Sequence, residues 1–331
     1  MNHRKRTLTV FLASALVLVG GYGAIWWVWS DATTSESADE LFEEYLAAHA
    51  RGELALAASH LTRLLKTDSS SVIYAIRAKV YQDMGELDEA VSDVTAAIDR
   101  HPESGTEQQS KILANYYYSR AILYVRLSKA DLAMADLTRT IAANPEHWIA
   151  LGERARLKVN AGDDAGAIVD TTLSLEIQED ALQYQLRGLA NNRLARYKAA
   201  LADYEKALST WNSGAVTYDP EQSGFFYASL ASFLAMCPDS EFRDGNRALQ
   251  LAKTACEQSD WQDAAYLSTL AAAYAENGDF ETAIKWQESA IEKSEKGPVL
   301  DWHRRRLSLL RDGKPLREHG EAIDYARLHS R

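Results

Sequence analysis

The chain has 331 residues, of which 47% are apolar and 25% charged, and it carries a formal net charge of −11 at pH 7. The first thirty residues hold three bases and no acid, so the remaining chain has 47 acids against 33 bases, a formal charge of −14. Such an acidic body repels nucleic-acid phosphates and anionic lipid, which excludes a general nucleic-acid-binding role.

The amino-terminal residues have the pattern of a signal anchor. The basic cluster Arg4–Arg6 precedes an uncharged run from Thr7 to Trp29, whose 23 residues would reach roughly 34 Å as a helix and cross a bilayer core. A cleaved signal usually has a shorter apolar region that ends in small residues, whereas this run ends in interfacial tryptophans. Cleavage at Ser30–Ala32 is the alternative. The basic flank predicts a cytoplasmic amino terminus, and therefore a body on the outer side of the cytoplasmic (inner) membrane.

A unit of about 34 residues recurs along the rest of the chain. Its clearest copies run from Tyr74 to Pro102 and from Leu267 to Ala290. The copies place small Ala or Gly residues where two helices would cross, larger Tyr, Leu or Phe residues beside them, and Gly or Pro at helix ends. One copy is displaced by nine extra residues, which we assign to a loop over Glu103–Leu113. Two further copies, around Gly52 and after Gly224, are degenerate.

This pattern resembles the tetratricopeptide repeat family over about Asp39 to Glu295, where several copies keep the same phase. The resemblance implies an all-α solenoid of about six to seven helical hairpins, here preceded by one transmembrane helix. The block from Cys237 to Ala290 is also similar to a carboxy-terminal repeat block of large bacterial tetratricopeptide proteins, which favours a bacterial source. The expected domains are a cytoplasmic tip with a transmembrane signal-anchor helix in residues 1–30, a polar linker in residues 31–38, the repeat solenoid in residues 39–297, and a capping helix with a tail in residues 298–331.

Arginine and aspartate recur in register in four consecutive copies. Each arginine directly precedes the small residue of a first helix, and each aspartate follows the alanine of a second helix by three residues. The pairs are Arg77 and Asp93, Arg120 and Asp136, Arg154 and Asp170, and Arg187 and Asp203. We predict that each arginine meets an aspartate, within or between neighbouring hairpins, in a structural ladder of charge-assisted hydrogen bonds. A row of arginines that grips an acidic ligand is the alternative.

The resemblance implies that the first helix of each hairpin lines a concave groove that binds a protein or peptide. The groove candidates are the polar residues beside the packing positions of these helices: Lys79, Gln82, Asp83, Arg126, Arg156, Asn160, Gln185, Asn192 and Arg193. This modestly basic row could hold an extended peptide or a chain end with a carboxylate. Carboxylate-clamping tetratricopeptide grooves use a Lys and Asn placement that these copies do not reproduce. A solvated helix face without a ligand is the alternative.

The last segment departs from the repeat. Trp302, Leu307 and Leu310 form one apolar face after Pro298, which predicts a helix that caps the last hairpin. The run Arg304–Arg306 offers an alternative contact with membrane phosphates, because the predicted span would hold the body near the bilayer.

Only two cysteines occur, Cys237 and Cys256, without a CxxC pair or a histidine at ligand spacing, so neither a zinc site nor a redox motif is expected. Their separation places them on the two helices of one hairpin. Two interpretations stay open: a disulfide in an exported body, or two small buried apolar residues.

Sequence patterns of common catalytic sites are absent: there is no GxSxG elbow, phosphate-cradling glycine loop, HExxH pair or dinucleotide fingerprint. No catalytic, cofactor or metal residue is therefore predicted. The sequence predicts a non-enzymatic, membrane-tethered scaffold that binds protein partners and no nucleic acid. An accessory subunit of an envelope enzyme, or of a secretion or assembly complex, is the second hypothesis, and an enzyme on a helical frame is the third.

Overall fold

The computed structural model describes residues 35–102, 105–214, 223–294 and 297–317, which form helices and turns without a β-strand. The segment predicted to span a membrane, Thr7 to Trp29, lies outside these residues. Among the helices that are described, none is long and apolar enough to cross a membrane. The chain divides into two compact units, Met1–Ala150 and Leu151–Arg331.

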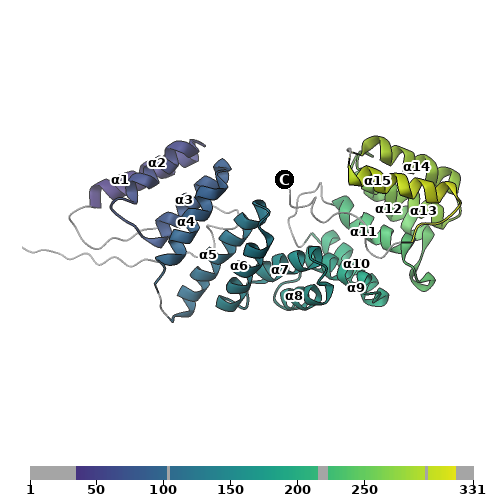
Figure 1. Ribbon diagram of the computed structural model, residues 1–331, viewed down its shortest axis with the longest axis horizontal. Coiled ribbons are helices and arrows are strands. Elements are labelled where there is room, and N and C mark those ends of the chain that lie inside the picture. Colours follow the sequence, from purple (N-terminus) through teal and green to yellow (C-terminus); the bar gives the residue numbers. More distant parts are fainter. Residues whose placement is uncertain (1–34, 103–104, 215–222, 295–296, 318–331) are drawn as a thin grey trace, which may run out of the picture. The chain divides into compact units, whose positions relative to one another are not determined.

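The first unit contains three helical hairpins. Their helices are α1 (Ser35–Ala50), α2 (Leu54–Leu64), α3 (Ser71–Met84), α4 (Leu87–Asp99), α5 (Glu107–Arg126) and α6 (Ala130–Ala143). The two helices of each hairpin lie side by side, and the second helix of one hairpin also contacts the first helix of the next (Figure 1). This order of contacts is that of a solenoid, in which each hairpin packs only on its neighbours in the sequence.

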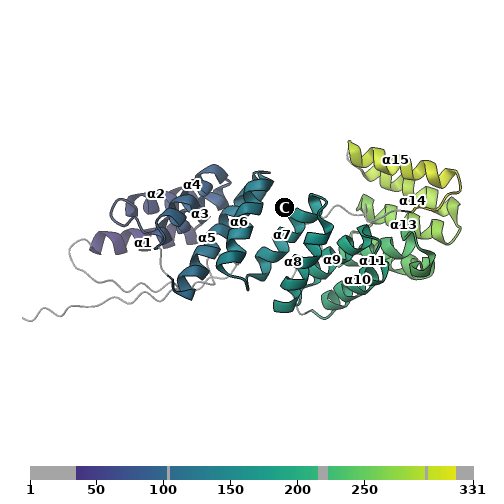
Figure 2. The ribbon, with the colours of Figure 1, turned by 60° about the horizontal axis from the view of Figure 1, so that its bottom comes forward.

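The division between the units falls inside helix α7 (Trp148–Asn160). The second unit continues with α8 (Asp164–Ile177), α9 (Ala181–Arg193), α10 (Tyr197–Asn212), α11 (Ser223–Met236), the short 3₁₀ helix η2 (Ser240–Phe242), α12 (Gly245–Gln258), α13 (Ala264–Glu276), α14 (Phe280–Lys293) and α15 (Pro298–Arg311). Helices α9 to α14 again form hairpins in sequence order, and α15 packs on α14 (Figure 2).

Alanine at the helix crossings explains the close packing of the hairpins. Ala90, Ala133, Ala167 and Ala200 stand at the same position of four second helices, and each has 0% of its surface exposed. A methyl side chain lets the backbone of the facing helix approach closely, while larger neighbours fill the space on either side. The small residues of the repeat therefore set the spacing between the helices.

The turn inside most hairpins places one residue in the left-handed backbone region. Gly52, Gly85, Gly162 and Gly278 occupy it with φ between 73° and 83°, whereas Ser128 (φ 57°) and Ala195 (φ 55°) hold the equivalent position in two other hairpins. Glycine adopts this conformation readily, but a Cβ atom meets the following carbonyl oxygen. These two hairpins therefore contain backbone strain at the turn.

The segment after α4 differs from the sequence expectation of a loop over Glu103–Leu113. Helix α5 begins inside that range and has 20 residues, so much of the insertion lengthens a helix. The Thr106 hydroxyl caps this helix by accepting a hydrogen bond from the backbone N–H of Gln109 (3.3 Å). Ile112 and Tyr116 are buried at helical spacing, which favours the added turns.

Helix α1 likewise begins at Ser35, inside the segment 31–38 that was expected to be a polar linker. Ala38 and Leu41 are buried in a cluster with residues of α2 and α3. These apolar contacts extend the repeat body towards the amino terminus. The Ser- and Thr-rich composition that suggested a linker is also favourable at the start of a helix.

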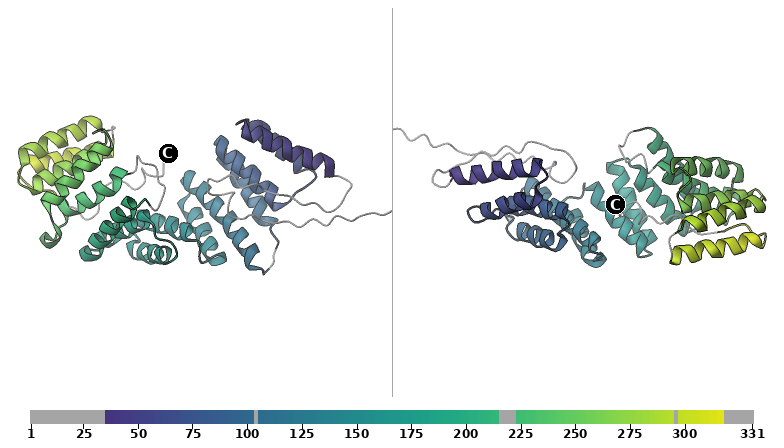
Figure 3. Two further views of the ribbon diagram at one scale, coloured as in Figure 1. Left: turned by 180° about the vertical axis from the view of Figure 1, so that it is seen from behind. Right: turned by 90° about the horizontal axis from the view of Figure 1, so that it is seen from above.

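Helix α15 covers the last hairpin, and Figure 3 shows it in yellow beside the green α14. Leu307 and Leu310 are buried, as is Leu316 after the helix. The three arginines of the run Arg304–Arg306 differ in exposure. Arg306 is only 3% exposed, whereas Arg304 and Arg305 are exposed. Arg306 therefore does not contribute to a surface that could meet membrane phosphates.

Candidate functional site

The structure brings together each arginine and aspartate that the repeat register had paired. In all four hairpins the arginine donates from Nε and Nη2, and both carboxylate oxygens of the aspartate accept. The distances are 2.7 and 2.6 Å for Arg77 and Asp93, 2.6 and 3.0 Å for Arg120 and Asp136, 2.8 and 2.7 Å for Arg154 and Asp170, and 3.1 and 2.7 Å for Arg187 and Asp203. Each pair joins the first and second helix of one hairpin, so the ladder acts within hairpins.

A column of threonines extends the ladder to the preceding hairpin. The Nη1 atoms of three of the arginines donate to a threonine hydroxyl there: Arg77 to Thr62 (2.9 Å), Arg120 to Thr95 (3.1 Å) and Arg187 to Thr172 (3.3 Å). Thr62 and Thr95 also donate to a backbone carbonyl of their own helix, which leaves an oxygen lone pair directed at the arginine. The sequence contains a pattern that could have predicted these threonine contacts, because Thr95 and Thr172 each follow a ladder aspartate by two residues.

The ladder is a structural element with little capacity to bind an acidic ligand. The aspartate side chains are at most 8% exposed and the arginine side chains at most 22%. The hydrogen bonds that Arg77 and Arg120 donate to Asp93 and Asp136 raise the pKa of both arginines, so both guanidinium groups stay charged. Since three or more donors of each of these arginines are already used, the arginine row is unsuited to gripping a carboxylate of a partner.

Three of the groove candidates in the first unit are available on the surface of α3. Lys79 and Asp83 form an i,i+4 ion pair (2.6 Å), with 42% and 32% of their side chains exposed, and the side chain of Gln82 lies beside them, half-buried. Arg126, at the end of α5, is directed back to α3 and donates to the backbone carbonyl of Gln82 (3.5 Å). This arginine therefore braces two neighbouring hairpins.

In the second unit the candidates differ sharply in exposure. Asn160 is exposed, but Arg156, Gln185 and Asn192 are buried, with 8%, 5% and 5% of their surfaces exposed. Arg156 donates from Nε and Nη2 to Glu153, one turn earlier on the same helix (3.0 and 2.7 Å). Arg156, Gln185 and Asn192 were predicted to line the partner-binding groove, with a solvated helix face as the alternative. Their burial contradicts that alternative at these three positions.

Arg193 repeats the role of Arg126. It lies at the end of α9 and donates to the backbone carbonyl of Val159 at the end of α7 (3.0 Å), with Asp164 at 3.6 Å. Burial raises the pKa of the Asp164 carboxyl, and the Arg193 charge opposes this effect. Both arginines donate to a carbonyl in the last turn of a preceding first helix. The same carbonyls accept a hydrogen bond from the turn glycine, Gly85 for Gln82 and Gly162 for Val159 (both 3.1 Å).

The carboxy-terminal hairpins contain a buried polar network that the sequence analysis did not identify. Ser268 donates to Gln287 (2.8 Å), the Gln287 amide contacts Nδ1 of His303 (3.1 Å), and Arg306 donates to Ser268 (2.9 Å). The Arg306 guanidinium also lies over the Trp302 ring, 4.4 Å from its centroid. All four network residues are at most 3% exposed, so the network connects α13, α14 and α15 inside the core.

A second polar contact fastens the chain after α15 to the same hairpins. Oε1 of Glu276 accepts a hydrogen bond from Arg243 (2.8 Å), and Oε2 forms an ion pair with Arg317 (2.6 Å). Arg243 also donates to the carbonyls of Cys237 (2.9 Å) and Pro238 (3.1 Å). Arg243 and Arg317 therefore hold the irregular connection after α11 and the segment that follows α15 to α13.

The two cysteines are free and buried, which contradicts the disulfide and supports the small apolar residues that were its alternative. Burial raises the pKa of the Cys237 thiol and raises that of Cys256 to about 12. Neutral thiols of this kind are poor nucleophiles and poor metal ligands. Within the described part of the chain, no group of three or more His, Cys, Asp or Glu side chains is arranged to hold a metal ion.

The comparisons with known proteins agree with this architecture. Residues 118–181 and residues 264–296 match two models of the tetratricopeptide repeat. A tetratricopeptide repeat protein from Parabacteroides merdae aligns at 17% identity and a TM-score of 0.58, over 83% of this chain and 100% of that one. The Cut9–Hcn1 hetero-tetramer of the APC/C aligns at 13% identity and a TM-score of 0.59, over 83% of this chain and 49% of the other. At these identities the similarity concerns the fold alone.

A search of curated proteins gives no match. The repeat matches and the order of the hairpins together identify the class, a helical-hairpin solenoid. Two of its segments, residues 118–181 and 264–296, are similar to tetratricopeptide repeats.

Proposed function

We propose that this protein is a membrane-tethered scaffold that binds a protein or peptide partner along the first helices of its hairpins. The observation that carries the proposal is the tetratricopeptide fold, in which each of the two units stacks its hairpins in sequence order. Within one unit, the stacked hairpins hold these side chains in position before the partner arrives, which lowers the entropic cost of binding.

The residues on which we base partner binding are the exposed and half-buried groove candidates. In the first unit they comprise Lys79, Gln82 and Asp83 on α3 and Arg126 at the end of α5. In the second unit they comprise Asn160 on α7 and Arg193 at the end of α9. These side chains offer donors and acceptors to the backbone of an extended peptide. The buried residues Arg156, Gln185 and Asn192 would support the shape of the second unit's surface without direct contact.

Crosslinking tests the surface directly. A photoreactive residue at Lys79 or at Asn160 in the full chain is expected to form one defined adduct in cells. Ser92 on α4 and Lys285 on α14 are matched controls, because both lie on second helices at exposed or half-buried positions. Equal adducts from the control positions would contradict binding along the first helices.

The tether is proposed from the sequence pattern of the first thirty residues, with Arg4–Arg6 before the uncharged run that ends at Trp29. The body would then lie outside the cytoplasm, where a short tether raises its local concentration at the membrane. The full chain is expected to resist alkaline extraction from membranes, and deletion of residues 1–30 should release it. Complete extraction of the full chain at alkaline pH would contradict the tether.

A further inference from the structure

Helix α8 carries an exposed aliphatic stripe that the hairpin packing does not use. Val169, Leu173 and Ile177 follow one another at intervals of four residues, with 57%, 43% and 42% of their surfaces exposed. Residues four apart lie on one face of a helix, so the three side chains form a continuous strip about 12 Å long. The buried side of the same helix is formed by other residues, including Ala167 and Thr171.

No other second helix in the described residues has such a stripe. The positions are defined by their distance from the buried alanine of the second helix, two, six and ten residues after it. Their occupants elsewhere are Ser59, Arg63 and Thr67; Ser92, Ala96 and Arg100; Ala135, Arg139 and Ala143; Ala202, Lys206 and Thr210; Gln250, Thr254 and Gln258; and Lys285, Ser289 and Lys293. Six hairpins thus form with small, polar or charged residues there. The repeat fold therefore does not require the stripe of α8.

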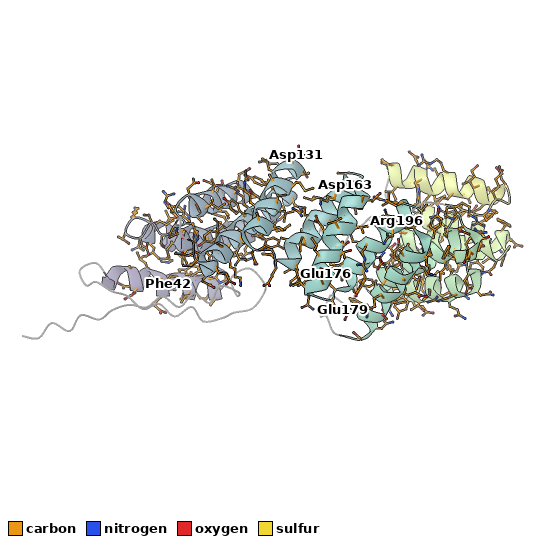
Figure 4. All side chains as sticks on the ribbon, turned by 90° about the horizontal axis from the view of Figure 1, so that it is seen from below. Phe42, Asp131, Asp163, Glu176, Glu179 and Arg196 are labelled. Atoms are coloured by element: carbon orange, nitrogen blue, oxygen red, sulfur yellow. The ribbon has the colours of Figure 1, made fainter. Side chains whose placement is uncertain are left out.

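The sequence segment that contains the stripe has acidic residues and no basic ones. Residues 161–180 contain six acids and no base. Asp170 is paired with Arg154 and Lys158, and Glu179 is paired with Lys206 (2.6 Å). Asp163 and Glu176 are exposed near opposite ends of α8, where Figure 4 labels them. An exposed apolar strip with acidic residues at both ends is suited to a partner that combines aliphatic side chains with positive charge.

We propose that α8 is a docking site for an amphipathic helix whose aliphatic face is flanked by Lys or Arg. This site lies on a second helix and does not depend on the proposed groove. A second copy of the chain fits it poorly, because two α8 helices paired antiparallel about a twofold axis would bring Asp163 of one next to Glu176 of the other. An anionic lipid surface is disfavoured by the same charges.

Two synthetic peptides test the proposal on the purified full chain. Both have about five helical turns and the same leucine stripe, and one is flanked by lysine and the other by glutamate. Fluorescence anisotropy is expected to show binding of the lysine peptide at least about tenfold tighter than that of the glutamate peptide. The combined change Val169→Ser, Leu173→Ala and Ile177→Thr keeps the charge and should remove most of this binding. Leu309→Ser on α15 is the matched control, because Leu309 is 41% exposed outside the stripe.

Each outcome decides the proposal. Loss of binding in the triple variant, with unchanged binding in the control and unchanged helical circular dichroism in both, supports it. Equal affinity for the two peptides, or lysine-peptide binding that survives the triple change, overturns it. A dimer of the full chain that dissociates in the triple variant would also overturn it, because a second copy would then be the occupant.

Discussion

The ladder hairpins, α3 to α10, and the carboxy-terminal hairpins, α11 to α14 with α15, join their helices by different chemistry. In the ladder hairpins an arginine on the first helix holds an aspartate on the second. In the α13–α14 hairpin the same register contains Leu270, which is fully buried, and Trp286, which stacks on Trp261 with centroids 5.1 Å apart. Directional hydrogen bonds are thus replaced by apolar contacts at the same place in the repeat.

This difference shows that the repeat needs a contact at these positions but not a particular type of contact. A bidentate ion pair fixes the relative orientation of two helices, whereas burial of a leucine contributes free energy without much directionality. The carboxy-terminal hairpins obtain direction from elsewhere, through the buried hydrogen bonds of Ser268, Gln287 and His303. The predictions below test this contrast, beginning with the largest effect.

The largest expected effect is on the reactivity of Cys256, in the carboxy-terminal hairpins. The pKa of Cys256 is about 12 instead of the ordinary 9.0, so at pH 8 its thiolate population falls about a thousandfold. Alkylation of the native protein by iodoacetamide at pH 8 should be negligible at Cys256 and rapid after unfolding.

The raised pKa of Cys256 also makes the stability of the protein depend on pH. The thiol ionises above about pH 9 in the unfolded protein but stays neutral in the folded protein, so the free energy of unfolding should fall between about pH 9 and 12.

The second effect tests whether a ladder rung can be exchanged for an apolar pair. Asp136→Ala removes a carboxylate that is 1% exposed and strands the Arg120 guanidinium, so it should lower the free energy of unfolding by about 3 kcal/mol. The double change Arg120→Met and Asp136→Leu imitates the α13–α14 hairpin and should recover most of this loss. Urea denaturation measures both variants. A double variant no more stable than the single one would show that the ladder hairpins depend on the ion pair.

The third effect concerns the polar network of the carboxy-terminal hairpins. Gln287→Ala removes a fully buried amide that bonds to Ser268 and contacts His303, and should cost about 2 kcal/mol in the free energy of unfolding. Glu288→Ala, at the next position on the exposed side of α14, is the control and should change stability little. Thermal unfolding followed by circular dichroism distinguishes them, and equal midpoints for the two variants would contradict a structural role of the network.

The smallest effect concerns the hairpin turns. Ser128→Gly and Ala195→Gly relieve a left-handed backbone that costs a residue with a Cβ about 1 kcal/mol, so each should raise the free energy of unfolding by about 0.5 to 1 kcal/mol. Gly85→Ala at the equivalent turn should lower it by a similar amount. Denaturant midpoints measure all three, and a loss of stability in both glycine variants would show that the turns are not strained.

Several parts of the fold were predictable because their signals are local and periodic. The alanine spacing indicated the hairpins, and the offset between Arg77 and Asp93, repeated three more times, indicated which side chains face one another. The insertion before α5 was assigned to a loop, because a helix extension and a loop of equal length look alike in a single copy. The capping hydrogen bond of Thr106 and the burial of Ile112 distinguish the two only in three dimensions.

The groove candidates were harder to predict, since exposure depends on the neighbouring hairpins. Lys79 and Asn192 both occupy polar positions on a first helix, yet Lys79 is partly exposed and Asn192 is buried. The same limit applies to Arg126 and Arg193, whose long side chains reach a carbonyl of the preceding hairpin. Their sequence positions alone do not reveal where such side chains are directed.

The sequence by itself determined the repeat period, the helical class and the pairing of Arg with Asp, because each of these follows from spacing along a helix of known geometry. Only the tertiary structure decided which polar residues are covered, that Ser268, Gln287, His303 and Arg306 meet in one network, and that the stripe of α8 is exposed. Burial is a property of surfaces that are brought together from distant parts of the chain, and one-dimensional spacing does not contain it.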